Sequence, residues 1–175
     1  MKTVAILTAT ALAGLPALAH AEMFNGAYGG VELGWEDTRG VLDQGINYGI
    51  VGGYNAKLGT SIVVGAEGKL GFSTADETFA VGEGTSKLSA GRSLGVAARA
   101  GYLAAPNALF YTKVGYENVR TKLDGDGFNT DAVVLGGGVE YGLTQNIGVK
   151  VGYDYTDGEN GYRRHQVKTG LNFHF

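Results

Sequence analysis

Apolar and polar residues alternate at every second position in eight segments of the sequence, and this period restricts the possible folds more than any other feature. A period of two is that of a β-strand, whose successive side chains point to opposite faces of a sheet. Each segment is about as long as the roughly 9–11 residues that a tilted strand needs to cross a bilayer. The pattern predicts an all-β chain with strands at residues 27–36, 46–57, 62–73, 93–102, 110–117, 133–143, 147–156 and 164–175.

The connections between these segments alternate in length. Residues 58–61, 103–107 and 144–146 form short connections, whereas residues 37–44, 74–87, 120–130 and 157–163 form longer, polar ones. Short turns at one end and long loops at the other are typical of outer-membrane barrels. We therefore expect an eight-stranded antiparallel up-and-down transmembrane β-barrel with four extracellular loops. An even number of strands would place both mature termini in the periplasm.

The two faces of the predicted strands differ in side-chain size. One face carries large aliphatic and aromatic residues, and the other carries long charged residues interleaved with many of the 31 glycines. The interior of an eight-stranded barrel is just wide enough for side chains to fill it, and glycines would make room there for Glu, Lys and Arg. A soluble, lipocalin-like barrel would have the opposite orientation, with its apolar face inside. We expect the apolar face to contact lipid, because a charge there would cost about 2–4 kcal/mol at the bilayer midplane.

Acidic and basic side chains are nearly balanced on the predicted inner face, and unpaired charges in a narrow lumen would be costly. If the strands flanking residues 144–146 pair in the simplest register, Glu140 contacts Lys150. Asp154 is expected to pair with Arg164 or Lys168. The predicted lumen charge network consists of Glu32, Glu36, Lys57, Glu67, Lys69, Arg99, Lys113, Glu117, Glu140, Lys150, Asp154, Arg164 and Lys168.

Aromatic residues on the apolar face fall into two groups by height, as expected for side chains that anchor a barrel at the two membrane interfaces. The first group lies near the short turns and consists of Tyr54, Tyr102, Phe110, Tyr141, Phe173 and Phe175. The second lies near the longer connections and consists of Trp35, Tyr48, Phe72, Tyr116 and Tyr155.

The first 21 residues have the features of a cleavable secretory signal. Lys2 precedes an apolar stretch over residues 4–18, and Ala19-His20-Ala21 matches the small-x-small cleavage pattern. We expect a signal peptide at residues 1–21 and a single barrel domain at residues 22–175. The sequence contains no cysteine, which excludes disulfides and thiolate metal sites, and its net charge of −3 argues against nucleic-acid binding.

Three stretches resemble the small outer-membrane β-barrel family that includes the OmpA transmembrane domain, OmpX-like proteins and opacity-type surface proteins. They are GAYGGVELGW at residues 26–35, LFYTKVGYENVR at residues 109–120 and VKTGLNFHF at residues 167–175. The last stretch is similar to the signal read by the barrel-assembly machinery, with Val167, Thr169, Leu171, Phe173 and Phe175 on one face. The resemblance implies residence in the outer membrane, and it implies the assembly machinery and periplasmic chaperones as partners during biogenesis.

Other candidate sites are weaker. The acidic residues Asp124, Asp126 and Asp131 do not have the spacing of an EF-hand, so no metal is expected. His165 lies close in sequence to Asp157 and Glu159, but no nucleophile for a lipid A hydrolase or acyltransferase is evident. A further basic set, Arg92, Arg120 and Arg163, would lie near the outer end, where it could contact lipopolysaccharide phosphates or remain in water.

These features favour a structural or surface-interaction role through the four loops, without catalysis or cofactors. The partners expected are outer-membrane lipid and lipopolysaccharide, together with an unidentified extracellular ligand. The alternative is a small porin that passes ions or small solutes through a narrow polar lumen. A lipid A-modifying enzyme is a third possibility.

Overall fold

The computed structural model describes residues 23–39, 42–74, 76–81, 84–123 and 126–175, and within them the chain is almost entirely β-strand. The 3₁₀ turn η1 covers Glu159–Gly161. The strands are β1 (Gly26–Arg39), β2 (Leu42–Leu58), β3 (Ile62–Ser73), β4 (Asp76–Val81), β5 (Gly84–Ala105), β6 (Ala108–Leu123), β7 (Asp126–Gly142), β8 (Ile147–Gly158) and β9 (Arg163–His174). No helix in these ranges is long and apolar enough to cross a membrane.

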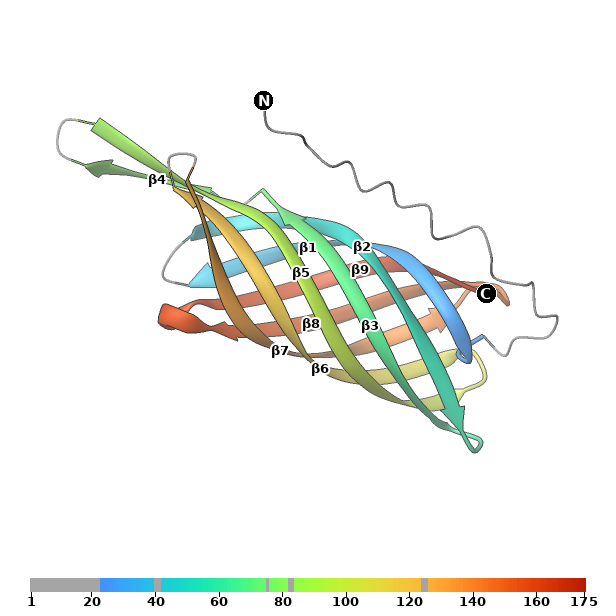
Figure 1. The fold of residues 1–175 in the computed structure, drawn as a ribbon. Coiled ribbons are helices and arrows are strands. Elements are labelled where there is room, and N and C mark those ends of the chain that lie inside the picture. Colours follow the sequence, from blue (N-terminus) through green and yellow to red (C-terminus); the bar gives the residue numbers. More distant parts are fainter. Residues whose placement is uncertain (1–22, 40–41, 75, 82–83, 124–125) are drawn as a thin grey trace, which may run out of the picture.

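Every wall strand pairs antiparallel with its neighbours, and the sheet closes on itself (Figure 1). β1 pairs with β9, which joins the first strand to the last, and β3 pairs with β5. Over the described ranges, the wall thus consists of eight strands, all except β4. Closure satisfies backbone hydrogen bonds at every wall strand, which a bilayer requires. The predicted eight-stranded antiparallel barrel is confirmed.

The two ends of the barrel differ. One end, called here the terminal end, carries the start of β1, the last residue Phe175 and the short turns at residues 59–61, 106–107 and 143–146. At the opposite end, β4 and the first part of β5 form a two-stranded extension that projects beyond the wall (Figure 1). This extension is called the hairpin, and the end that carries it is the hairpin end.

The prediction of long loops at the hairpin end is wrong. Strand pairing continues to Thr38↔Leu42 between β1 and β2, and to Leu123↔Asp126 between β6 and β7. Residues 74–87, expected as a loop, contain β4 and the beginning of β5. An antiparallel ladder can continue for as long as its two arms remain opposite each other, and each further pair satisfies backbone donors and acceptors. The polar sequence therefore marked where the apolar face of the strands ends rather than where the strands themselves end.

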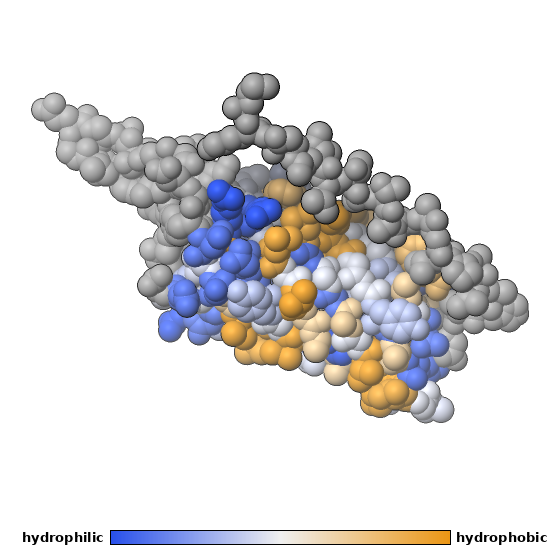
Figure 2. All heavy atoms as spheres, in the orientation of Figure 1, coloured by the Kyte–Doolittle hydropathy of each residue, from blue (hydrophilic) through white to orange (hydrophobic). Residues whose placement is uncertain are grey.

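The wall separates the two faces as expected. Leu33, Val151 and Leu171 lie on the outside and are 50–57% exposed, whereas Arg99 and Glu140 lie inside and are at most 4% exposed. Figure 2 shows hydrophobic residues spread over the wall in view, with hydrophilic residues gathered toward the hairpin end. The large apolar side chains thus form the surface that meets the surroundings, which is the arrangement of a protein dissolved in lipid.

Candidate functional site: the charged lumen

Glycines on the inner face provide the space that the lumen side chains occupy. A Cβ atom at Gly53 would lie 2.6 Å from the Tyr28 hydroxyl. Cβ atoms at Gly138 and Gly152 would lie 3.0 and 2.9 Å from the Tyr111 hydroxyl. These distances are too short for real contacts, so the two tyrosines fit because the facing positions have no side chain.

Arg99 on β5 is the centre of the lumen network. Its guanidinium lies 3.4 Å from a Glu140 oxygen on β7 and 3.6 Å from a Glu67 oxygen on β3, and it donates a 2.9 Å hydrogen bond to the Tyr28 hydroxyl. Its carbon Cζ also lies 4.3 Å from the centre of the Tyr111 ring. One cation therefore contacts side chains from four other strands and links them across the barrel.

Lysines connect the remaining central carboxylates. Lys113 lies 3.2 Å from Glu67 and 3.1 Å from Asp154, and Lys150 lies 2.8 Å from Glu32 and 3.7 Å from Glu67. Lys168 contacts both Glu32, at 3.1 Å, and Asp154. Each lysine bridges two carboxylates, so none of these buried charges is left without an opposite charge.

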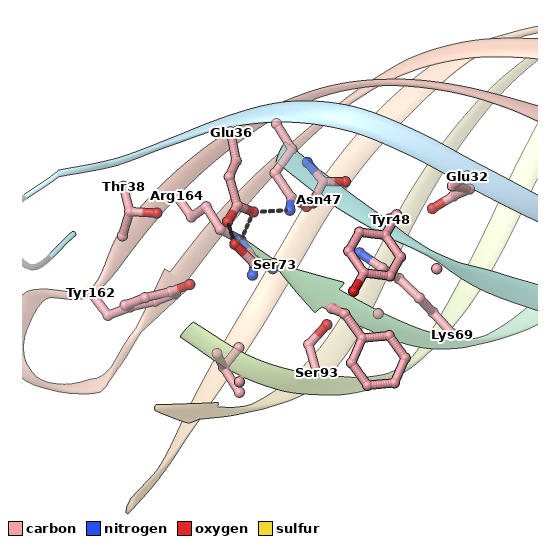
Figure 3. A pocket seen from close by; sticks show the side chains of 16 residues that line it. Glu32, Glu36, Thr38, Asn47, Tyr48, Lys69, Ser73, Ser93, Tyr162 and Arg164 are labelled. Carbon is pink, nitrogen blue, oxygen red and sulfur yellow. Dashed lines mark hydrogen bonds and ion pairs between the residues drawn. The ribbon is translucent and has the colours of Figure 1, made fainter. Parts of the chain in front are cut away.

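A smaller network occupies the hairpin end of the lumen (Figure 3). Glu36 accepts hydrogen bonds from Ser73 and from the Gln166 side-chain nitrogen, the latter at 2.7 Å. Arg164 lies 2.6 Å from Glu117, whose other oxygen lies 3.8 Å from the Lys69 nitrogen.

Tyr162 covers the smaller network from the segment between η1 and β9, and burial raises the pKa of its phenol. A pocket lies below it, lined by Glu36, Arg164, Gln166 and neighbouring residues. This cavity has room for roughly one water molecule.

Lys57, another predicted site residue, lies nearer the terminal end of the barrel. Lys57 is half-buried near the terminal end of β2, where its backbone amide donates to the Asn25 side-chain oxygen at 3.0 Å.

The register predictions are partly right. Glu140 and Lys150 are directly opposite each other on β7 and β8, as expected. The predicted ion pair between them is wrong, because Glu140 turns to Arg99 whereas Lys150 turns to Glu32. Each of these partners lies two strands away around the wall. In a narrow lumen, long side chains reach past the adjacent strand, so a neighbour in register need not be the ionic partner. Asp154 does pair with Lys168.

An apolar cluster that the alternating pattern did not predict closes the terminal end of the lumen. Phe24, Val63 and Leu109 are at most 2% exposed and pack with Tyr111. His174 lies beside this cluster and contacts Glu140 at 2.7 Å through its Nε2 atom. Val63 and Leu109 lie next to the short turns, where the alternation of the strands gave only a weak signal, and Phe24 precedes the first strand.

Most of the residues predicted for the outer face of the barrel lie there. Of the eleven aromatic residues in the two groups, ten are exposed on the outside. The eleventh, Tyr155, is half-buried, with its ring centre 5.1 Å from that of His165. Tyr48 stacks on Phe72 with ring centres 5.8 Å apart. The five residues proposed as an assembly signal also lie on the outer face of β9 and at its end. Their reading by the assembly machinery stays a prediction.

The other candidate sites gain no partners that would support catalysis or metal binding. His165 contacts Tyr153, with 2.5 Å between the ring nitrogen and the hydroxyl, whereas Asp157 lies 3.7 Å from Arg163. Among the described residues, no group of three or more His, Asp or Glu side chains could hold a metal ion. Arg92 and Arg120 are exposed at the hairpin end. Asp124 and the predicted signal peptide lie outside the described residues.

Comparisons with known proteins agree with this architecture. The family model described as outer membrane protein beta-barrel domain matches residues 5–175. The structure of Ail, the attachment invasion locus protein of Yersinia pestis, has a TM-score of 0.61 at 12% identity, covering 86% of this chain and 99% of that chain.

The structure of Neisserial surface protein A has a TM-score of 0.57 at 14% identity, covering 85% of this chain and 96% of that chain. At such identities the two structures establish a shared fold alone. No curated protein matches at the level of sequence.

Proposed function

The chain belongs to the outer membrane protein β-barrel domain family, and we propose that it acts at the cell surface by contacts made through its hairpin end. The observation that supports this proposal is the contrast between the two parts of the molecule. The lumen is filled by paired charges, whereas the hairpin projects beyond the wall. A barrel whose strands extend beyond the wall, and whose lumen is largely filled by side chains, is better suited to binding than to transport.

The proposed orientation places the hairpin end outside the cell and the terminal end in the periplasm. Short periplasmic turns and longer outer extensions are the usual arrangement of such barrels. An epitope inserted between Val81 and Gly84 should be detected by antibody on intact cells. The same epitope inserted in the turn between β2 and β3, after Gly59, should be detected only after the outer membrane is permeabilised. The reverse pattern would refute the orientation.

A binding role is tested by shortening the hairpin. Residues 76–87 can be replaced by a two-residue turn, which leaves the pairing of β3 with β5 intact. Cells that express the intact chain should attach to cultured epithelial cells more than cells without it, and the shortened variant should lose most of this gain. One of the similar structures is an attachment protein by its name. Equal attachment by both variants would contradict the proposal.

A small porin is the second candidate, and one observation favours it. Several buried polar atoms in the lumen have no hydrogen-bond partner in the protein, among them Thr38 Oγ1, Thr156 Oγ1 and Gln166 Oε1. Such atoms are usually satisfied by water, so part of the lumen is expected to be hydrated. Recordings in planar bilayers distinguish the two candidates. We expect no steady conductance steps from the intact chain, and regular steps would favour the porin.

We propose no catalytic role. The structure groups His165 with tyrosines rather than with an acid and a nucleophile. Lipid A extracted from cells that overproduce the chain should therefore have the same mass as lipid A from control cells. A new acylation state of lipid A would contradict this proposal.

A further inference from the structure

The apolar cluster at the terminal end includes two residues that precede the barrel wall. Met23 and Phe24 lie before β1, yet Phe24 is only 2% exposed and Met23 packs against the same cluster. Segments that precede a first strand are usually solvated and poorly fixed unless something holds them. Here the chain turns from the wall into the lumen.

Two features hold this turn. Gly26 has φ of 134°, a conformation that residues with a side chain rarely adopt, and its Cβ would lie 3.2 Å from the Phe175 carbonyl oxygen. Asn25 accepts a hydrogen bond of 3.0 Å from the Lys57 backbone amide. Gly26, the first residue of the wall, thus permits the turn, and Asn25 before it is hydrogen-bonded to β2.

Glycines also provide the space that the Met23 side chain occupies. The Met23 sulfur lies against Gly142 on β7, and a Cβ atom at Gly148 on β8 would lie 3.2 Å from the Met23 methyl carbon. The Phe24 ring meets the His174 ring edge-on, with 5.5 Å between ring centres. His174 in turn contacts Glu140, the carboxylate that faces Arg99, so the Phe24 ring is linked to this carboxylate through the His174 ring. A Cβ atom at Gly148 would also lie 2.9 Å from a Glu140 oxygen, so Met23 and this carboxylate border the same glycine.

We propose that Met23 and Phe24 form an intramolecular stopper, which seals the terminal end of the lumen and keeps water away from the Glu140–Arg99 side of the charge network. The seal is apolar and comes from a segment that is not part of the closed sheet. It can therefore be removed without breaking the barrel. Under the predicted cleavage after Ala21, both residues remain in the mature chain.

The absence of cysteine from the sequence gives a clean background for a labelling test. Asn55 is a suitable probe position, because it is fully buried, it lies opposite Gly26 in the register, and its side-chain nitrogen and oxygen have no hydrogen-bond partner. The reaction of Asn55→Cys with a small, charged methanethiosulfonate reagent should be slow in the otherwise unchanged barrel. Adding Phe24→Ala should accelerate it roughly tenfold or more, because the access of reagent limits the reaction of a buried thiol.

The control substitution removes a phenylalanine ring from the outer face of the wall instead of from the lumen. Phe173 lies on the outer face of β9 at the same end and is 47% exposed, so Phe173→Ala should leave the labelling rate of Asn55→Cys unchanged. A second probe, Ser93→Cys, lines the pocket at the hairpin end, and its rate should not respond to Phe24→Ala. Folding of each variant is checked by its different migration on gels with and without boiling.

If Phe24→Ala does not fold, Met23→Ala in the same probe background provides the second variant. Unchanged labelling of Asn55→Cys in a folded Phe24→Ala or Met23→Ala barrel would overturn the proposal, as would equal acceleration by Phe173→Ala. The stopper is independent of the proposed surface role. Attachment to cells should be the same with and without Phe24→Ala, so each idea can fail without the other.

Discussion

Replacing Arg99 by methionine tests whether the lumen network holds the barrel together. Methionine keeps most of the length of the side chain, and it can still pack on Tyr111, but it removes the cation that contacts Glu140, Glu67 and Tyr28. Breaking a buried ion pair by removing one partner costs about 3–5 kcal/mol. The lower end applies here, because Glu67 retains Lys113 and Glu140 retains Asn172 and His174. We expect Arg99→Met to lower the free energy of unfolding by about 3 kcal/mol.

Arg163 provides the matched control. It also contacts a carboxylate, with 3.7 Å to Asp157, but its side chain is 61% exposed. Exposed ion pairs contribute about 0–1 kcal/mol, so Arg163→Met should change stability by no more than that. Unfolding by urea in lipid vesicles can be followed by the fluorescence of Trp35, the single tryptophan. An equal loss of unfolding free energy in Arg99→Met and Arg163→Met would refute the view that burial makes the lumen ion pairs important for stability.

Adding Glu140→Gln to Arg99→Met should recover part of the lost stability, since it removes the carboxylate that lost its cation, and no recovery would show that Glu140 is already neutralised by its other partners. Gly53→Ala should lower the free energy of unfolding by about 1–3 kcal/mol, because the new Cβ would lie 2.6 Å from the Tyr28 hydroxyl. Gly52→Ala, whose Cβ would lie 3.7 Å from the nearest atom, should be nearly neutral in the same unfolding assay. Val151→Arg on the outer face should cost about 2–4 kcal/mol if the residue lies near the bilayer midplane, and Val151→Leu should cost little; equal effects would mean that this position does not face lipid.

The alternation of apolar and polar residues predicted most of the fold, because every strand of a barrel wall has the same period of two, with one face toward the lumen and the other toward the outside. Leu33 and Val151 point outward and Arg99 and Glu140 point inward for the same reason, which is that the side-chain period is two. The closure of β1 on β9 and of β3 on β5 then follows from the number of strands. What the pattern could not predict is where the strands end, since residues 76–81 are paired in the hairpin beyond the wall and need no apolar face.

The site was harder to predict than the fold. Glu140 lies opposite Lys150, as the pattern predicts. Ionic partners across a lumen, however, depend on side-chain reach and on strands far away in the sequence, so Lys150 contacts Glu32 instead. The inward tyrosines Tyr28 and Tyr111 both contact Arg99, and alternation along one strand does not show which side chains meet across the lumen. Phe24 lies outside every alternating segment, so no period could have shown that it enters the lumen.

The central claim is the orientation of the wall, and a cysteine scan along β8 from Gly148 to Tyr155 tests it most directly. Each single-cysteine variant, reconstituted in lipid vesicles, is treated with a thiol reagent confined to the hydrocarbon phase. We expect labelling at Val149, Val151, Tyr153 and Tyr155 and protection at Gly148, Lys150, Gly152 and Asp154. Labelling of the second set with protection of the first would mean that the charged face meets the lipid, which would contradict the account.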